Sequence, residues 1–388
     1  MLHHSIFYHI KGVGNLNKKL KAGIAAALVS LLVLTSPGCS PKKYNGAKTV
    51  GIAMPAKSLE RWNRDGEYLK QKFEAAGYNV ELRFSDNSTD QQVNDIQVLI
   101  ADDVDLLIIA AIDGSTLFRT LEDAEIKNIP VIAYDRLIMN TDSVACYISF
   151  DNYSVGKMQA QFIVDELGLD DSEETYNIEL VSGDSADNNA VFFYNGAVDL
   201  LAPYIDSGRL KIPSGKREFL QTSTPGWSID LAFENMQNTL ASYYSDGTIL
   251  DAVLSAYDGL SIGALQAIQS DYTGGNMPVI TGQDGDIAAL RNIVDGTQTM
   301  TIYKNVNNEA NVTVEVAKAI LDGKPIDGTL VSSLSAECVF DTESYDNGKK
   351  YVPSYLLTPE VITIENLGSL VDTGLYKWDS EYKYLVAD

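Results

Sequence analysis

The sequence predicts an α/β protein in which two lobes each contain a doubly wound parallel sheet. Strand and helix patterns alternate from residue 49 onward with few interruptions, and the alternation starts again after residue 155. Repeated strand–helix units are joined by right-handed crossovers and give parallel sheets. The chain has 388 residues, and this many units favour two sheets over one very wide sheet.

The first half of the chain alternates short apolar runs with helical patterns. The run at 106–111 is apolar throughout, which is typical of a strand that is buried on both faces. Val93, Ile96, Leu99 and Ile100 recur at helical spacing and predict an amphipathic helix. The predicted strands are 49–54, 80–84, 106–111, 131–134 and 146–150, and the predicted helices are 59–76, 90–101 and 117–127.

The second half repeats the pattern and ends in a strand–helix–strand unit over 279–304. Ile287, Leu290 and Val294 lie at helical spacing in this unit, and Gly296 is expected to end the helix. The β-branched segment 297–303 is the expected returning strand. The other predicted strands are 178–182, 219–222, 252–255 and 279–281, and the other predicted helices are 155–167, 189–201, 228–245, 260–270 and 308–321.

The N-terminal residues have the pattern of an export signal. Residues 1–21 contain four lysines and no acid, and 22–34 form an apolar run that is too short to span a bilayer. The segment Thr-Ser-Pro-Gly-Cys that ends at Cys39 resembles the lipobox of bacterial lipoproteins. We therefore expect a signal peptide over 1–38, lipid on Cys39 and a tether over 39–47. The alternative is ordinary signal cleavage nearby.

Composition excludes several kinds of partner and chemistry. Removing residues 1–38 changes the formal net charge from −24 to −28, which argues against nucleic acid and anionic lipid as partners. All three histidines, His3, His4 and His9, lie in this leader, so neither a catalytic triad nor a histidine-ligated metal is expected. No nucleotide-binding motif is present either, and we expect no cofactor and no metal. Cys146 and Cys338 are expected to be buried free thiols.

Polar residues follow the predicted strands in both halves. The carboxyl ends of parallel strands lie at one rim of a sheet, where ligands bind. Two such rims facing each other would enclose a ligand with charged and amide groups. Taken singly, each residue could instead be a helix cap or part of a solvated loop. The strand-end residues are Lys57, Arg61, Asp113, Asp135, Arg136, Asp184, Asp187, Asn189, Asp258, Asp284 and Lys304.

These residue types suit a sugar. Carboxylates and guanidinium groups can each bind two neighbouring hydroxyls. Trp62 and Trp227 offer flat apolar faces that could stack on a pyranose ring, although core packing is the alternative for each.

Several motifs resemble those of the xylose-binding proteins of ABC sugar importers and the related multiple-sugar receptors. The likeness covers about 49–359 in the same order, and Lys-Ser-x-x-Arg-Trp at 57–62 is more similar to the second group. The other motifs are Leu-Glu-Arg-Trp at 59–62, Ala-Tyr-Asp-Arg at 133–136, Tyr-Ile-Ser-Phe-Asp-Asn at 147–152, Asp-Asn-Asn-Ala at 187–190, Gly-Gln-Asp at 282–284 and Gly-Thr-Gln-Thr-Met-Thr-Ile-Tyr-Lys at 296–304.

The resemblance implies the type I periplasmic-binding-protein fold, with a three-stranded hinge between the lobes. Lobe 1 would comprise 48–150 and 305–331, and lobe 2 would comprise 151–304 and 332–388. The chain would cross at 150–152, just after Lys304 and again near Val331. The implied sugar contacts are Lys57, Arg61, Trp62, Asp135, Arg136, Asn189, Trp227, Asp284 and Lys304.

One position departs from the family pattern. Xylose-type proteins carry Asn-Asp where this chain has Tyr257 and Asp258, so the resemblance does not fix the sugar. Tyr257, Asp258 and Asp113 complete the set of candidate ligand-binding residues.

We therefore expect a sugar-binding lipoprotein of an ABC importer without catalytic activity, monomeric and attached to the outer face of the cell membrane or periplasmic. Its ligand would be xylose or a related aldose such as glucose, galactose or arabinose, and its partner the ABC permease, with the membrane reached only through the lipid. One alternative is a glycoside hydrolase that uses two cleft carboxylates. It is disfavoured because Lys and Arg in the cleft should keep the acids ionised. The other alternative is a sensor ectodomain for a chemoreceptor or kinase.

Overall fold

The computed structural model describes residues 46–171 and 173–388, which lie in a compact unit that begins at Tyr44. The predicted signal peptide, Cys39 and most of the tether lie outside these residues. Within the described residues, no helix is long and apolar enough to cross a membrane.

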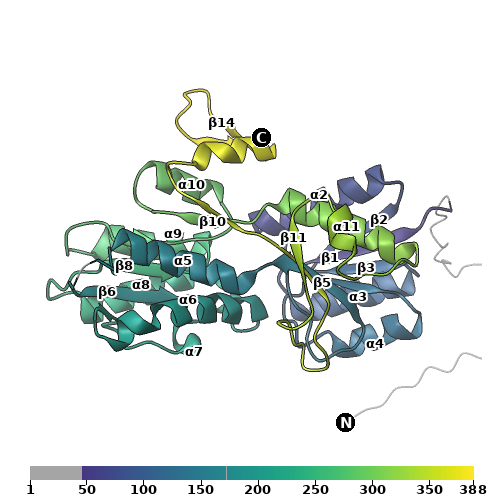
Figure 1. The fold of residues 1–388 in the computed structure, drawn as a ribbon, viewed down its shortest axis with the longest axis horizontal. Coiled ribbons are helices and arrows are strands. Elements are labelled where there is room, and N and C mark those ends of the chain that lie inside the picture. Colours follow the sequence, from purple (N-terminus) through teal and green to yellow (C-terminus); the bar gives the residue numbers. More distant parts are fainter. Residues whose placement is uncertain (1–45, 172) are drawn as a thin grey trace, which may run out of the picture. The chain divides into compact units, whose positions relative to one another are not determined.

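The first lobe contains a seven-stranded sheet with the order β11-β12-β5-β4-β3-β1-β2 (Figure 1). All neighbouring strands run parallel except β11 and β12, which pair antiparallel. The strands are β1 (Thr49–Met54), β2 (Asn79–Phe84), β3 (Leu106–Ile109), β4 (Val131–Tyr134), β5 (Val144–Phe150), β11 (Cys338–Asp341) and β12 (Ser354–Leu357).

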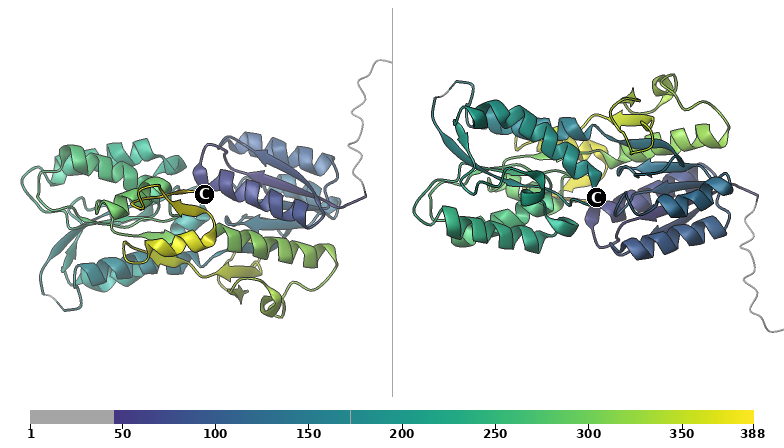
Figure 2. Two further views of the ribbon diagram at one scale, coloured as in Figure 1. Left: turned by 90° about the horizontal axis from the view of Figure 1, so that it is seen from above. Right: turned by 90° about the horizontal axis from the view of Figure 1, so that it is seen from below.

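Helices cover both faces of this sheet (Figure 2). On one face, Ile52 of β1 packs with Phe73 of α2 (Glu60–Ala75) and Val316 of α11 (Val306–Leu321). On the other face, α3 (Thr89–Ala101) and α4 (Phe118–Ile126) pack on the alternate side chains of the same strands. Burial on both sides explains why β1 and β3 are apolar without alternation, and it confirms the doubly wound prediction.

The second lobe contains a parallel four-stranded sheet with the order β7-β6-β8-β9. One face is covered by α5 and α6, and the other by α8 and α9. The strands are β6 (Tyr176–Val181), β7 (Leu210–Lys211), β8 (Ala252–Ser255) and β9 (Val279–Ile280), and the helices are α5 (Asn152–Glu166), α6 (Asn188–Asp206), α8 (Ile229–Tyr243) and α9 (Asp258–Asp271).

The C-terminal segment packs on the end of the second lobe. Its β13 (Glu360–Ile362) pairs antiparallel with β10 (Thr301–Tyr303). The following η3 (Leu367–Thr373) and the hairpin of β14 (Tyr376–Trp378) and β15 (Leu385–Ala387) share an apolar core with α10 (Ile287–Val294). Figure 1 shows this segment in yellow beside α10.

The chain crosses between the lobes three times. The first two crossings run from β5 to α5 and from β10 to α11. The third was predicted near Val331 but comes between Leu357 and Glu360. Residues 338–357 therefore belong to the first lobe, because β12 pairs with β5 and β11 pairs with β12. This hairpin extends the sheet beyond β5, whose edge would otherwise be open.

One predicted strand is a helix. Residues Phe219–Thr222 form the single turn α7, because Glu218 and Gln221 make a capping box that satisfies its first backbone N–H groups. The returning strand over 297–303 is also shorter than predicted, since only Thr301–Tyr303 is extended in a sheet. Cys146 and Cys338 are buried free thiols, as predicted.

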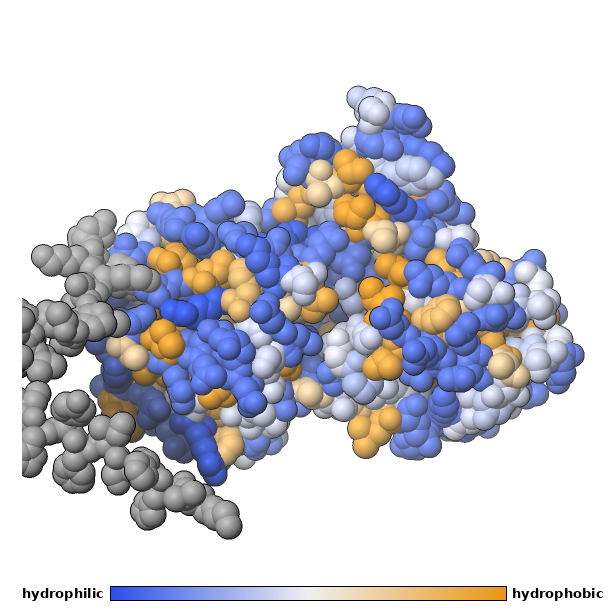
Figure 3. All heavy atoms as spheres, turned by 180° about the vertical axis from the view of Figure 1, so that it is seen from behind, coloured by the Kyte–Doolittle hydropathy of each residue, from blue (hydrophilic) through white to orange (hydrophobic). Residues whose placement is uncertain are grey.

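The face shown in Figure 3 is mainly hydrophilic, and its hydrophobic residues lie in small separate groups. This surface agrees with the formal net charge of −24.

Candidate functional site

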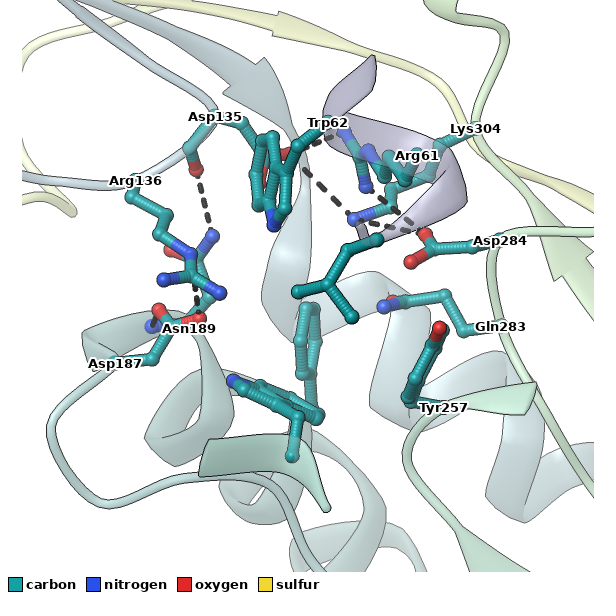
Figure 4. Close-up of a pocket in the computed structure, with 13 residues that line it drawn as sticks. Arg61, Trp62, Asp135, Arg136, Asp187, Asn189, Tyr257, Gln283, Asp284 and Lys304 are labelled. Carbon is teal, nitrogen blue, oxygen red and sulfur yellow. Dashed lines mark hydrogen bonds and ion pairs between the residues drawn. The ribbon is translucent and has the colours of Figure 1, made fainter. Parts of the chain in front are cut away.

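A cavity lies between the carboxyl ends of the two sheets, and both lobes contribute to its wall (Figure 4). About 500 Å³ between the lining side chains is not filled by atoms, and part of this space is open to solvent. The lining residues are Leu59, Arg61, Trp62, Asp135, Arg136, Asp187, Asn189, Phe193, Trp227, Tyr257, Gln283, Asp284 and Lys304.

Nine of the twelve predicted ligand-binding residues line this cavity. They are Arg61, Trp62, Asp135, Arg136, Asn189, Trp227, Tyr257, Asp284 and Lys304.

The backbone at two strand ends is unusual. Asp135 directly follows β4 with a φ of 55°, and Asp284 has a φ of 93° and is followed by Gly285 at 69°. Non-glycine residues rarely adopt positive φ, and such conformations cluster at functional sites. Both turns bring a carboxylate to the cavity wall, where Figure 4 shows Asp284 close to Arg61 and Lys304.

Arg61 joins the two lobes at the centre of the site. From the first turn of α2 it donates to Asp135 at 2.7 Å and to Asp284 of the second lobe at 2.9 Å. Lys304 Nζ lies 3.5 Å from the same oxygen of Asp135 and 3.3 Å from that of Asp284. Two cations and two carboxylates thus alternate in space, with all four side chains at most 10% exposed.

Two further acids hold Arg61 from behind. Asp65 Oδ2 lies 3.3 Å from Arg61 Nε, and Glu309 Oε2 lies 3.2 Å from Nη2. Both acids are fully buried. The whole group, called the Arg61 cluster below, consists of Arg61, Asp65, Asp135, Asp284, Lys304 and Glu309.

Burial and charge divide the acids of this cluster. Burial would raise the pKa of Asp135, but the positive charges of Arg61, Lys304 and Arg136 outweigh it and lower that pKa. Burial raises the pKa of Asp65, and burial together with the charge of Asp135 raises the pKa of Glu309 well above its usual value. The cations therefore favour the charged form of Asp135, the acid that faces the cavity, whereas burial disfavours the charged forms of Asp65 and Glu309 behind it.

A second ion pair crosses the cleft. Arg136 Nε lies 3.0 Å from Asp187 Oδ2 of the second lobe, and its guanidinium carbon lies 4.9 Å from the centroid of the Trp62 ring. Figure 4 shows Trp62 between Arg136 and Arg61. Burial raises the pKa of Asp187 even though Arg136 is adjacent, whereas the cations lower the pKa of Asp135, so the expected effect of the cations on the cleft acids prevails at Asp135 and is opposed by burial at Asp187.

Asn189 also bridges the lobes. Its Nδ2 donates to the backbone oxygen of Asp135 at 2.6 Å, and its Oδ1 accepts from the Tyr147 hydroxyl at 3.0 Å. The backbone N–H of Asn189 donates to Asp187 at the start of α6, so the N-cap fixes the position of both residues.

Aromatic rings and unpaired polar atoms complete the wall. Trp227 meets Tyr257 at 6.0 Å and 89° and Phe193 at 6.5 Å and 66°. Gly183 is required beside Trp227, because a Cβ there would lie 2.0 Å from the indole. Trp227 Nε1 and Gln283 Oε1 are buried without a protein partner. Buried polar groups are normally hydrogen-bonded, so one donor and one acceptor remain for a ligand.

Three predicted residues lie outside the cavity lining. The Lys57 side chain is 64% exposed, and its Nζ is 3.9 Å from Glu67. Asp113 accepts hydrogen bonds from the backbone N–H and hydroxyl of Ser115 in its own turn. Asp258 is fully buried behind the wall, where it accepts from Asp286 N, Gln298 Nε2 and Thr301 Oγ1 at 2.9–3.0 Å.

Four lining residues were missing from the predicted set. Asp187 was among the strand-end residues but was not chosen as a contact, and Gln283 stands inside the Gly-Gln-Asp motif, so its position next to a strand end could have added it. Leu59 and Phe193 are apolar residues next to or within helices, and nothing in a helical apolar pattern separates a cavity wall from a core.

Known proteins share this sequence and arrangement. The family described as "Periplasmic binding protein domain" matches residues 50–325. The multiple sugar-binding periplasmic receptor ChvE of Rhizobium radiobacter is 43% identical, over 92% of this chain and 97% of its own length. The D-xylose-binding periplasmic protein of Escherichia coli is 32% identical, over 91% and 97%.

A solved structure agrees with these relatives. The crystal structure of an ABC transporter solute-binding protein from Clostridium phytofermentans, with bound β-D-glucose, is 42% identical and superposes with a TM-score of 0.80. The match covers 86% of this chain and 99% of that one. The chain therefore belongs to the periplasmic binding protein family, among its sugar-binding receptors, and it is a binding protein rather than an enzyme.

Proposed function

We propose that this protein captures a monosaccharide aldose in the cleft and delivers it to an ABC permease. The observation that carries the proposal is the Arg61 cluster, which places charged donors and acceptors from both lobes at one point of the cavity. Such groups bind hydroxyls that donate and accept at fixed spacing. Relatives named for multiple sugars and for D-xylose, and a similar structure with bound glucose, support the same ligand class.

The nine predicted residues that line the cavity are the proposed sugar contacts. Asp135 and Asp284 accept hydrogen bonds from hydroxyls, and Arg61, Arg136 and Lys304 donate to hydroxyl oxygens. Trp62 and Trp227 supply the apolar faces that a pyranose ring needs. Closure of the lobes removes water from the sugar and strengthens each charged hydrogen bond.

A calorimetric titration tests the proposal. Protein truncated before Ser40 is titrated with xylose, arabinose, glucose and galactose, and at least one should bind with a dissociation constant on the order of micromolar. Failure of all four sugars to bind at millimolar concentration would refute it.

We also propose that Cys39 carries a lipid and that the protein acts as a monomer on the outer face of the cell membrane. The lipobox-like segment before Cys39 supports this placement. Cys39→Ser protein should leave the membrane fraction. Wild-type protein found entirely free in the medium would contradict the lipid anchor.

A further inference from the structure

The turn that presents Asp284 is held from several sides. Asp284 N donates to the backbone oxygen of Ile302 at 2.8 Å, and Gly285 N donates to Thr301 Oγ1 at 3.3 Å. These bonds fix the N–H groups of a turn whose positive φ values are unfavourable for a residue with a Cβ. The carbonyl of Gly285 is fixed from elsewhere: it accepts from the Tyr376 hydroxyl at 2.9 Å.

Tyr376 is rigidly placed in the C-terminal hairpin. Its side chain is 2% exposed, and its ring packs edge-on to Tyr303 at 6.0 Å and 71°. The surrounding core includes Leu290 of α10 and Leu385 of β15. Gly285 lies directly against it, because a Cβ at Gly285 would be 3.2 Å from the Tyr376 hydroxyl oxygen.

The same hydroxyl also contacts the first lobe. Arg64 Nη1 donates to Tyr376 Oη at 3.3 Å, and Arg64 lies on α2 three residues after Arg61. A second hydrogen bond also links the first lobe to the C-terminal segment: Asn307 Nδ2 of α11 donates to the backbone oxygen of Thr373 at 2.8 Å. The C-terminal segment, which packs on the second lobe, thus joins both lobes beside the cleft.

We propose that Tyr376 is a positioning residue of the binding site, which holds Asp284 toward Arg61 and Lys304 through the Gly285 carbonyl and ties this turn to Arg64 of the other lobe. Among the described residues, Tyr376 is outside the set that lines the cavity, so it acts without touching the ligand. The inference rests on the proposed capture of an aldose. Loss of the Tyr376 hydroxyl removes the hydrogen bond to the Gly285 carbonyl and the contact with Arg64 of the first lobe, so the sugar should dissociate faster.

The experiment compares two conservative variants of one hairpin. Tyr376→Phe removes only the hydroxyl and keeps the ring contact. Tyr384→Phe is the matched control, because its hydroxyl bonds only to surface partners, Asp295 and Lys383. The tightest-binding aldose of the wild type is titrated into each variant, its dissociation rate is measured, and amide hydrogen exchange is followed in the sugar-free proteins.

Tyr376→Phe should weaken binding about tenfold, mainly through faster dissociation, as expected for one or two lost hydrogen bonds. Exchange should rise in 284–286 while the rest of the second lobe and the melting temperature stay near wild type. Tyr384→Phe should bind normally. Equal affinity of the two variants overturns the inference. So does a Tyr376→Phe protein with faster exchange throughout the second lobe and a lower melting temperature, since the role would then be structural. If the wild type binds no aldose, the proposed function itself fails.

Discussion

Two groups of buried acids lie within the same site, and they are held in opposite ways. In the Arg61 cluster, Asp135 and Asp284 contact a guanidinium and an ammonium. Behind the cavity wall, Asp258 is held by an amide, a hydroxyl and a backbone N–H, all neutral. Its neighbour Asp286 lies near the Tyr257 hydroxyl.

This difference determines which acids can act as charged hydrogen-bond acceptors for a ligand. Cations lower the pKa of Asp135, whereas burial and mutual repulsion raise the pKa of Asp258 well above its usual value. Burial, with repulsion from Asp284 and Glu60, raises the pKa of Asp286 to about 7. In the first group, the cations favour the charged form of Asp135 at the cavity wall. In the second group, Asp286 can take up a proton near neutral pH.

The largest effect is expected from removing the cation of the first group. Arg61→Met leaves buried carboxylates without their shared partner, which should destabilise the protein by about 3–5 kcal/mol and abolish sugar binding. Urea unfolding and calorimetry measure the two effects. Arg83→Met is the control, since Arg83 is 31% exposed and its acids lie 3.7–4.0 Å away. A cost below about 1 kcal/mol is expected there. Equal losses of stability in Arg61→Met and Arg83→Met would show that the Arg61 cluster contributes no more to stability than the ion pairs of Arg83.

The next effect concerns the ligand directly. Asp284→Asn should cost roughly 2–4 kcal/mol of sugar affinity, because the desolvated charges of Arg61 and Lys304 lose their partner. Asp113→Asn is the matched control, because both acids were predicted contacts but only Asp284 lines the cavity. Calorimetric titration of both variants measures their sugar affinities. Normal affinity of Asp284→Asn would reduce Asp284 to a residue that shapes its turn.

The second group gives a pH prediction. Because the pKa of Asp286 is higher in the folded protein than in the unfolded chain, the folded state binds more protons between these pKa values, and stability falls as the pH rises through about 7. The slope approaches 1.4 kcal/mol per pH unit, or about 2 kcal/mol between roughly pH 5.5 and 7. The slope should be shallower in the Asp286→Asn variant when sugar-free protein is unfolded in urea across the range, and Asp258, whose pKa is also raised, keeps part of it. Parallel curves for wild type and variant would contradict the assignment.

The same comparison shows what the sequence could reveal. Strand-end positions identified Arg61, Asp135 and Asp284, because the carboxyl ends of parallel strands converge whatever the loops do. Asp258 occupies the same kind of position, yet Gly282 leaves its carboxylate room to turn inward, since a Cβ there would lie 2.1 Å from Asp258 Oδ1. Spacing along the chain does not encode such a turn.

The hinge was harder to predict than the sheets. The β11–β12 hairpin joins the first sheet through partners more than two hundred residues earlier in the chain, and neither strand is long enough to give a clear alternating pattern. The C-terminal hairpin is similar. The proposed role of Tyr376 depends on its hydrogen bond to the Gly285 carbonyl, and no local sequence pattern indicates that contact. Such non-local contacts determine where the lobe boundary lies and how the turn at Asp284 is held.

The smallest effect is expected at Tyr257, where the two groups meet. This side chain lines the cavity and packs edge-on against Trp227, so it faces the cavity rather than the sheet. Tyr257 is the position at which the sequence departs from the xylose-type pattern described above, where a ring with one hydroxyl replaces an amide that donates and accepts. Tyr257→Asn should change the preference among xylose, arabinose, glucose and galactose about tenfold, the effect of one hydroxyl contact.

Calorimetry with the four sugars, together with the melting temperature, distinguishes specificity from packing. A changed order of preference at nearly constant melting temperature is the expected result, because only one wall of the cavity is altered while the Arg61 cluster is retained. Tyr257→Phe serves as the control, since it keeps the ring against Trp227 and removes only the hydroxyl. If that variant alters the preference as much as Tyr257→Asn, the hydroxyl sets the specificity. An unchanged order with a large loss of stability in Tyr257→Asn would instead make Tyr257 a packing residue and leave discrimination among sugars to the charged group opposite.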